Sequence, residues 1–323
     1  VWRSDDGKEV VCVGSKEELE RLSGRTVTDL HKHFVDAIEI PSREGRGMLK
    51  RIPEVLDCWF ESGAMPYAQA HYPFENKERF EATFPADFIA ESLDQTRGWF
   101  YTLVVLASAL FGGTAFRNVV VTGLVLAADG KKMSKRLRNY PEVGEIFGSY
   151  GADALRIYLM NSALVKAEEL NFSGEGVKEV LRAFHLPLWN SYSFFVTYAN
   201  LNHFDPATPA VPLEDRSVMD RWVLARLSSL VENVTAAIED SDVTGATRPI
   251  ADFVDELSNW YVRLSRRRFW NVDEDEESQR LSLAAHQTMY EVLVTVAQLL
   301  APFTPFIADE IYRNLVADAD PGK

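Results

Sequence analysis

The densest group of reactive side chains lies between residues 129 and 136, where the sequence reads Asp-Gly-Lys-Lys-Met-Ser-Lys-Arg. The Asp-Gly pair favours a tight turn. The three lysines and the arginine repel one another unless solvent or an anion compensates their charge. Lys132 and Lys135 lie on either side of Ser134, so both side chains could reach one polyphosphate. On charge alone, a solvated basic loop fits this pattern equally well.

A second polar group spans residues 91–100 and reads Glu-Ser-Leu-Asp-Gln-Thr-Arg-Gly-Trp-Phe. We expect it to follow a short strand at 88–90, where a helix over 94–110 begins. Open α/β sheets bind ligands in the crevice at the carboxyl ends of their strands. Alternatively, Asp94 caps the helix and has only a structural role.

Two further segments are rich in aromatic residues. Trp59 and Phe60 precede a turn and, taken alone, are more typical of a core than of a ligand pocket. Near the end of the chain, aromatic and arginine residues alternate, as single-stranded RNA loops require for stacking and phosphate contact. Alternatively, these aromatics pack in a bundle, and the arginines pair with Asp255, Glu256 or the acidic run 273–277. The alternating residues are Trp260, Tyr261, Arg263, Arg266, Arg267, Arg268 and Trp270.

The hydrophobic pattern that must position these groups changes along the chain. Residues 1–52 mix short alternating runs with glycine turns and predict a small β-rich connection. Residues 53–140 predict a strand, helix and strand crossover, whose β-branched second strand at 118–126 should be buried on both faces of a parallel sheet. Residues 141–176 predict a helical connecting segment. Apolar residues then recur at three and four over 177–323, which indicates a helical bundle. The predicted fold class is α/β followed by all-α.

Charge, cysteine and histidine content argue against several classes of protein. The 323 residues include 34 basic and 48 acidic side chains, and this net charge of −14 disfavours a protein that coats DNA through a broad basic surface. Two cysteines without Cys-x-x-Cys spacing predict neither a disulfide framework nor a zinc site and fit a reducing cytoplasm. His31 and His33 have no third ligand in spacing, so we expect no metal site. No apolar run approaches the roughly 20 residues of a membrane span.

In its motifs and their order, the chain resembles the class I aminoacyl-tRNA synthetases, and among them the isoleucyl-tRNA synthetases. Glu61 and Arg136 favour the eukaryotic-type branch. Valyl enzymes are similar around the lysine motif but differ over 94–99, and leucyl enzymes depart further. The segments that carry the resemblance are 29–31, 40–42, 57–66, 91–100, 132–136, 151–156, 259–270 and 300–306.

The resemblance implies the second half of a Rossmann-type parallel sheet over 53–140, a segment that contacts the tRNA stem, and an anticodon-binding bundle. It implies that isoleucine reacts with ATP and Mg²⁺ to form isoleucyl-adenylate, which then esterifies tRNA. Lys132 and Lys135 would bind the ATP phosphates and stabilise the charge that develops there, with Met133, Ser134 and Arg136 in support.

The same resemblance assigns the remaining candidate residues. Glu91 and Asp94 would face the ribose of the adenylate, and Gln95 its aminoacyl end. Trp59 and Trp99 would line the pocket for the isoleucine side chain, because two indoles form a stiff apolar slot. Ser92 stands where glycine is common in the family. The candidate tRNA contacts are Arg263, Arg266, Arg267 and Arg268.

Class I synthetases also need a His-x-Gly-His motif, and the six histidines here offer no such spacing. We therefore expect the chain, which begins at Val1 without an initiator methionine, to be part of a longer polypeptide whose upstream half supplies that motif and an editing domain. By itself it should be inactive. The alternatives are a valyl-type fragment and a non-catalytic tRNA-binding module. No DNA or membrane partner is expected.

Overall fold

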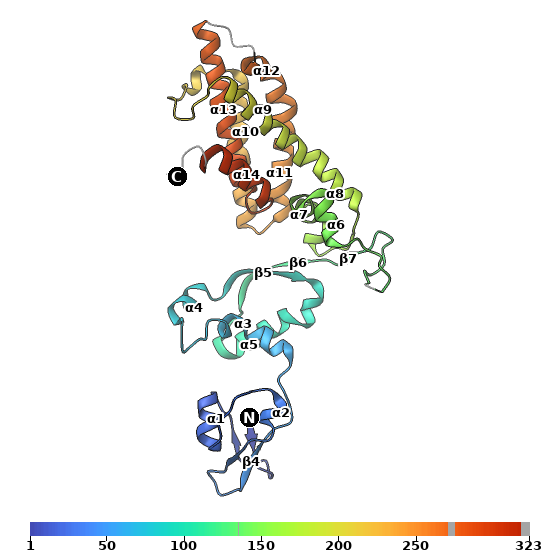
Figure 1. The fold of residues 1–323 in the computed structure, drawn as a ribbon, viewed down its shortest axis with the longest axis vertical. Coiled ribbons are helices and arrows are strands. Elements are labelled where there is room, and N and C mark those ends of the chain that lie inside the picture. The colour runs from blue at the N-terminus through green and yellow to red at the C-terminus, as the bar shows by residue number, and fades with distance from the viewer. Residues whose placement is uncertain (135, 271–274, 318–323) are drawn as a thin grey trace. The chain divides into compact units, whose positions relative to one another are not determined.

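The computed structural model describes residues 1–134, 136–270 and 275–317. The chain divides into two compact units, Val1–Gln69 and Ala70–Lys323 (Figure 1), and each is described by itself. The predicted site residue Lys135 and the acidic positions 273 and 274 lie outside the described residues.

The first unit is built on a small antiparallel sheet. Its strand order is β2-β1-β4-β3, and its core contains Trp2, Leu19, Ile40 and Leu49. The indole nitrogen of Trp2 donates to the carbonyl of Ile38 at 2.7 Å. The predicted β-rich connection over 1–52 has this form. The elements are β1 (Trp2–Arg3), β2 (Val10–Val11), α1 (Lys16–Ser23), α2 (Lys32–Val35), β3 (Glu39–Pro41), β4 (Met48–Arg51) and α3 (Cys58–Ala68).

The second unit begins with the predicted crossover. Helix α4 (Lys77–Thr83) leads into strand β5 (Ala86–Ser92), the short 3₁₀ helix η1 (Leu93–Arg97), α5 (Trp99–Phe111) and strand β6 (Phe116–Thr122). Strands β5 and β6 pair in parallel, from Ala86 opposite Phe116 to Ser92 opposite Thr122. Helix α5 is followed by the cap residue Gly112, whose φ of 71° suits a residue without a β-carbon. The strand, helix and strand order predicted from the sequence is confirmed.

The predicted single strand over 118–126 is wrong in one respect, because it is two strands. β6 ends at Thr122, and β7 (Val125–Leu126) pairs with β8 (Leu170–Asn171) instead. The break falls at Gly123, whose amide donates to the carbonyl of Leu164 at 2.8 Å. A β-carbon at Gly123 would lie 1.8 Å from the carbonyl oxygen of Glu168, so only glycine fits this approach. The expected burial of both faces is also wrong, since Val119 is 41% exposed.

The connecting segment passes into the bundle without a break in the helix. It contains α6 (Val143–Tyr150), α7 (Ala152–Met160) and the 3₁₀ helix η2 (Ala163–Lys166). Helix α8 (Gly174–Val180), the π-helical turn η3 (Leu181–His185) and α9 (Leu186–Leu201) then follow one another directly (Figure 1). The boundary predicted after residue 176 falls inside this continuous helix.

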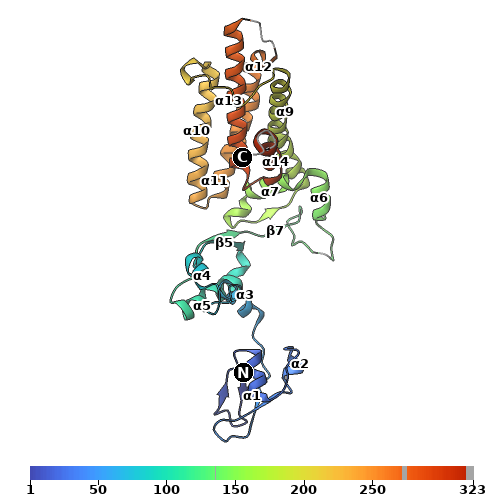
Figure 2. The same cartoon turned by 60° about the vertical axis from the view of Figure 1, so that its left-hand side comes forward.

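The remaining helices form the bundle, in which α10, α11 and α13 pack side by side (Figure 2). Phe195, Phe253, Tyr261 and Met289 are among its fully buried side chains. The predicted all-α second half is confirmed. The elements are η4 (Leu213–Asp215), α10 (Val218–Glu239), α11 (Val243–Glu256), the π-helical turn η5 (Leu257–Val262), α12 (Arg263–Trp270), α13 (Glu276–Leu300), α14 (Pro305–Tyr312) and the π-helical turn η6 (Arg313–Ala317).

Two sequence motifs that are distant in the chain meet where α7 contacts the bundle. The carboxylate of Asp153 accepts a hydrogen bond from the amide of Ile307 at 2.8 Å. The Nε of Arg156 donates to the carbonyl of Phe303 at 2.7 Å, and its Nη2 donates to that of Pro302 at 2.9 Å. Segments 151–156 and 300–306 therefore fix the connecting segment to the turn before α14.

Candidate functional site

The lysine motif forms a hairpin-like loop after β7. Leu126 and Lys132 form an isolated antiparallel bridge, and the amide of Ala127 donates to the carbonyl of Lys131 at 2.8 Å. Gly130 closes the turn with a φ of 78°, as the Asp-Gly pair predicts. The ammonium of Lys131 lies 3.1 Å from a carboxylate oxygen of Asp129 and lowers the pKa of that carboxyl group by hydrogen bonding. Lys131 is therefore already paired, whereas Lys132 forms no ion pair with the residues that the structure describes.

The side-chain amide of Asn139 holds the centre of the loop. Its Oδ1 accepts from the amide of Ser134 at 2.9 Å, and its Nδ2 donates to the carbonyl of Lys132 at 3.2 Å. Lys132 and Arg136 are exposed, whereas Met133 and Ser134 are partly buried. Sequence reasoning missed Asn139. The available signal was an asparagine in a turn-rich run, because asparagine side chains often bond nearby backbone.

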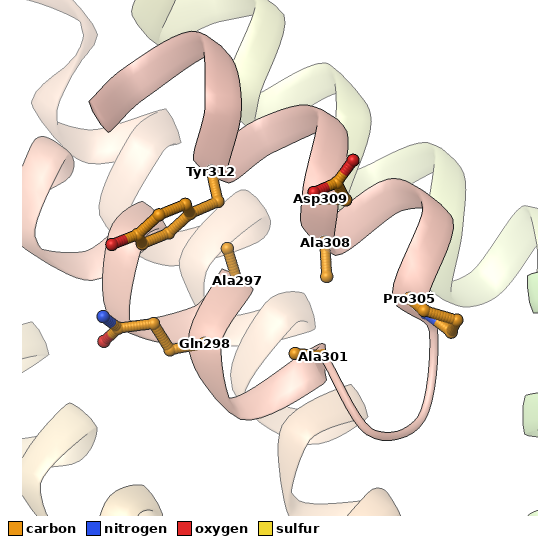
Figure 3. A pocket seen from close by; sticks show the side chains of 7 residues that line it. All are labelled: Ala297, Gln298, Ala301, Pro305, Ala308, Asp309 and Tyr312. Carbon is orange, nitrogen blue, oxygen red and sulfur yellow. The ribbon is translucent and has the colours of Figure 1, made fainter. Parts of the chain in front are cut away.

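A pocket of about 360 Å³ lies against the inner side of this loop. Met133 and Asn139 line it from the loop, and Tyr140, Tyr150 and Phe172 supply aromatic walls. A second pocket, of about 490 Å³, lies between the end of α13 and α14, and none of the predicted site residues that the structure describes lines it (Figure 3). Alanines at 297, 301 and 308 leave it open because they are small.

The predicted adenylate-facing residues lie at the carboxyl end of β5, where a parallel strand gives way to a helix. Glu91 is exposed in the last part of the strand, and Asp94 is exposed in η1. The structural alternative for Asp94 is wrong, because Asp94 lies inside η1 and not at the start of α5, which begins at Trp99. Instead, Oε1 of Gln95 accepts from the amide of Trp99 at 3.0 Å. Both carboxylates thus face outward at the edge where open sheets bind ligands.

The two candidate pocket tryptophans lie in different units. Trp59 is on α3 in the first unit and is 38% exposed, as is Phe60, so the expectation that this pair belongs to a core is wrong. In the second unit, Trp99 is partly buried against a small core that includes Leu103 and Ala107. A pocket lined by both indoles stays a prediction.

The arginine-rich segment presents most of its charge on one exposed face. Arg263, Arg266 and Arg267 on α12 are exposed, and none of them forms an ion pair with the residues that the structure describes. Trp260, on the preceding η5 turn, is 60% exposed, and Trp270 is 50% exposed. Two of the alternative partners bind other residues, since Glu256 pairs with Arg226 at 2.9 Å and Asp255 accepts from Asn259 at 2.7 Å. The acidic run 273–277 lies partly outside the described residues, so pairing with it stays a prediction.

Arg268 differs from the other three arginines because its guanidinium group forms an ion pair with a buried carboxylate. Its Nη1 and Nη2 lie 2.6 Å and 2.8 Å from the two oxygens of Asp220, which is fully buried. The hydroxyl of Tyr261 donates to the same carboxylate at 2.7 Å. Burial alone would raise the pKa of Asp220, but hydrogen bonds and the charge of Arg268 hold that pKa below its usual value. The predicted RNA contact by Arg268 is thus corrected, because this side chain anchors α12 to α10.

Tyr261 also departs from the predicted stacking face. It is fully buried, and burial together with the neighbouring Asp220 raises the pKa of its hydroxyl well above the usual value. The alternative that these aromatic residues pack in the bundle is therefore confirmed for Tyr261. Trp260 is mostly exposed, whereas Trp270 is half exposed and its ring lies against that of Tyr198. Helical spacing accounts for the difference in facing, because Tyr261, Ser265 and Arg268 recur at four and three residues on the buried face, whereas Trp260, Arg263 and Arg267 share the exposed face.

None of the helices in the part of the chain that the structure describes is long and apolar enough to cross a membrane. Within residues 1–134, 136–270 and 275–317, no three histidine, cysteine, aspartate or glutamate side chains converge as metal ligands.

Comparison with protein families gives this arrangement a class. The family of class I tRNA synthetases (I, L, M and V) matches residues 1–171, more than half of the chain, and the anticodon-binding domain of tRNA ligases matches residues 220–321. The chain belongs to the class I tRNA synthetases.

Two curated relatives that the chain matches are isoleucine-tRNA ligases. The chain is 51% identical to the isoleucine-tRNA ligase of Treponema denticola and 54% identical to that of Chlamydia trachomatis serovar D, in each case over 99% of its length. It spans about 30% of the length of these relatives. Both organisms are bacteria, and the eukaryotic-type branch expected from Glu61 and Arg136 stays a prediction.

Solved structures share the fold at lower sequence identity. The ternary complex of Agrobacterium radiobacter K84 LeuRS with tRNA and LeuAMS is 18% identical, with a TM-score of 0.63, over 86% of this chain and 33% of that one. Mycobacterium tuberculosis methionyl-tRNA synthetase with methionyl-adenylate is 20% identical, with a TM-score of 0.66, over 85% and 52%. The predicted half of a Rossmann-type sheet followed by a helical bundle is confirmed.

Proposed function

We propose that this chain is part of an isoleucyl-tRNA synthetase, which activates isoleucine with ATP as isoleucyl-adenylate and transfers it to tRNA. The observation that carries the proposal is the identity of 51–54% to isoleucine-tRNA ligases over 99% of the chain. The cytoplasm is the proposed location.

The proposed role of the lysine loop is electrostatic. When the isoleucine carboxylate attacks the α-phosphate of ATP, negative charge builds on the phosphoryl oxygens and on the departing pyrophosphate. The attacking carboxylate is already ionised, so the step needs no general base. Fixed cations at Lys132 and Lys135 stabilise this developing charge. ATP enters the reaction as its Mg²⁺ complex. Met133, Ser134 and Arg136 support the two lysines, and the exposure of Lys132 leaves it accessible to a phosphate.

The proposed adenylate site lies at the carboxyl end of β5. Glu91 and Asp94 are exposed carboxylates that can accept hydrogen bonds from ribose hydroxyls. The Oε1 of Gln95 is engaged by Trp99, which leaves its amide group to donate to the aminoacyl end. Trp59 and Trp99 are the proposed apolar walls around the isoleucine side chain, because indole rings lose little conformational freedom on binding.

The proposed tRNA contact of the bundle is the exposed face of Arg263, Arg266 and Arg267 with Trp260 and Trp270. Exposed guanidinium groups bind phosphates, and exposed indoles stack on unpaired bases. Arg268 is left out of this contact because Asp220 holds it. The anticodon loop is the single-stranded part of tRNA that suits such a face.

The test measures ATP-pyrophosphate exchange by the full-length enzyme that contains this chain. Exchange should depend on isoleucine and saturate at lower concentrations of isoleucine than of valine. A preference for valine would support the valyl-type alternative and overturn the proposal. Absence of exchange with every amino acid, together with tRNA binding, would instead indicate a non-catalytic module.

The chain by itself provides a second measurement. Because it spans about 30% of the length of its relatives and contains no His-x-Gly-His motif, we expect no ATP-pyrophosphate exchange from the purified chain. Isoleucine-dependent exchange by the purified chain would contradict this part of the proposal.

A further inference from the structure

The backbone of Lys132 is held from two directions. On one side, the bridge to Leu126 ties it to the strand β7. On the other, its carbonyl oxygen accepts from Nδ2 of Asn139 at 3.2 Å. The peptide carrying the proposed phosphate ligand is thus fixed by a strand and by a side chain.

The same amide also fixes the next part of the motif. Oδ1 of Asn139 accepts from the backbone amide of Ser134 at 2.9 Å. The amides of Leu137 and Arg138 both donate to the carbonyl of Ser134, at 3.1 Å and 2.9 Å, which closes a turn around it. One side chain therefore bridges the two ends of the Lys-Met-Ser segment from the opposite side of the loop.

These bonds lie within the loop and not within a core. Asn139 is partly buried, and both of its hydrogen-bond partners are backbone atoms of residues 132–134. Loss of the amide would therefore change the conformation of the loop without opening a cavity in a packed core. A cationic side chain stabilises developing charge best when its position is set before the reaction, since no energy is then needed to reorganise it.

We propose that Asn139 is a positioning residue of the phosphate-binding loop, whose two backbone hydrogen bonds fix Lys132 and Ser134 for contact with the ATP phosphates. This inference rests on the proposed function, because it assigns Asn139 to the ATP side of that reaction. It predicts that Asn139 affects the use of ATP and not the recognition of the amino acid.

The experiment compares Asn139→Ala and Asn139→Asp in the full-length enzyme by ATP-pyrophosphate exchange. Alanine removes both hydrogen bonds. Aspartate has the same shape and keeps the acceptor for Ser134, but it turns an oxygen toward the carbonyl of Lys132. We expect both variants to lose about tenfold in kcat/KM for ATP, while KM for isoleucine stays within about twofold of wild type.

The matched control is Asn314→Ala in the bundle. The Nδ2 of Asn314 also makes two hydrogen bonds, to Tyr192 and to Glu310, each at 3.0 Å. This variant should leave the ATP parameters unchanged. Wild-type ATP parameters in Asn139→Asp would overturn the proposal, because shape alone would then suffice. Equal changes in KM for ATP and isoleucine, with a lower Tm, would also overturn it in favour of a general structural role.

A binding measurement separates this proposal from the proposed function. Calorimetric titration of the wild-type enzyme and Asn139→Ala with ATP and Mg²⁺ needs no amino acid. If isoleucine fails to support exchange, the proposed function fails, and a weaker ATP affinity of Asn139→Ala still supports the positioning role. Equal ATP affinities combined with equal exchange rates would overturn the positioning role whatever the amino acid.

Discussion

The chain contains two basic clusters in an acidic background, and they are held in different ways. In the loop over 129–139, the amide of Asn139 holds the backbone of Lys132 and Ser134, and the side chain of Lys132 is exposed. On α12, one arginine of the cluster is itself the anchor, since Arg268 is 17% exposed and paired with the fully buried Asp220. The loop is fixed by local hydrogen bonds, whereas the helix is fixed by an ion pair in a core.

This difference predicts whether substitutions in each cluster change the reaction with ATP or the stability of the fold. Changes in the loop should alter chemistry at ATP with little change in stability, because its contacts are local. Changes at the anchor of α12 should alter stability first. The following predictions test this distinction, and their expected effects decrease from the first to the last.

Removal of the buried carboxylate should have the largest effect. Asp220→Ala leaves Arg268 partly buried without its counter-charge and removes the acceptor of the Tyr261 hydroxyl. We expect the free energy of unfolding to fall by about 3–5 kcal/mol. Urea denaturation of the chain followed by circular dichroism measures this change. The control is Glu256→Gln, which breaks the more exposed pair with Arg226 and should cost less than about 1 kcal/mol. Similar losses in both variants would contradict the anchoring role.

Removal of the exposed lysine should affect the reaction and not the fold. Lys132→Ala in the full-length enzyme should lower kcat/KM for ATP about 100-fold, because one fixed donor at the developing charge is lost. ATP-pyrophosphate exchange measures the loss. Lys131→Ala is the matched control, since Lys131 is already paired with Asp129, and it should change kcat/KM less than about threefold. Equal losses in the two variants would indicate a general charge effect.

Removal of two exposed arginines should weaken tRNA binding by a smaller amount. We expect the double variant Arg266→Ala/Arg267→Ala to bind tRNA about tenfold more weakly at low salt, with a less steep dependence on salt concentration. Filter binding over a range of salt concentrations measures both quantities. Arg280→Ala removes an arginine that pairs with Asp215 at 3.2 Å and should leave the salt slope unchanged. An unchanged slope in the double variant would exclude phosphate contacts by these residues.

The smallest expected effect is the change with pH in the stability that the ionised Asp220 contributes. The pKa of Asp220 is lowered in the folded chain, so its ionisation stabilises the fold fully above the unfolded value of about 3.8. That stability is lost as pH falls through the lower pKa of the folded state. The stability difference between wild type and Asp220→Asn should therefore be constant from pH 7 to pH 5 and shrink below about pH 4. A difference that grows on acidification would contradict the sign of the shift.

The sequence predicted the order of elements well because that order depends on local patterns. Apolar spacing marked the helices of the bundle, and the β-branched run marked β6. Contacts between distant residues were not predictable in this way. Nothing in the local pattern around Gly123 shows that the backbone of Glu168 approaches it, and this contact divides the strand.

The candidate site shows the same limit. Lys132 and Ser134 could be proposed as phosphate-binding residues from residue type and motif, and those roles stay predictions. The hydrogen bonds of Asn139 depend on a loop conformation that spacing does not give. Arg268 looked like its neighbours in sequence, and only the folded bundle brings it to Asp220. The roles of Lys135, which lies outside the described residues, and of Trp59 with Trp99 stay predictions.

The continuous helix formed by α8, η3 and α9 has a mechanical consequence. Val177 near its start belongs to the small core around Ile146 and Ala154, whereas Phe195 nearer its end belongs to the core of the bundle. From Gly174 to Leu201, at about 1.5 Å per residue, the helix is roughly 40 Å long. At this length, a tilt of about 5° at one end of a rigid helix would displace the other end by roughly 3 to 4 Å.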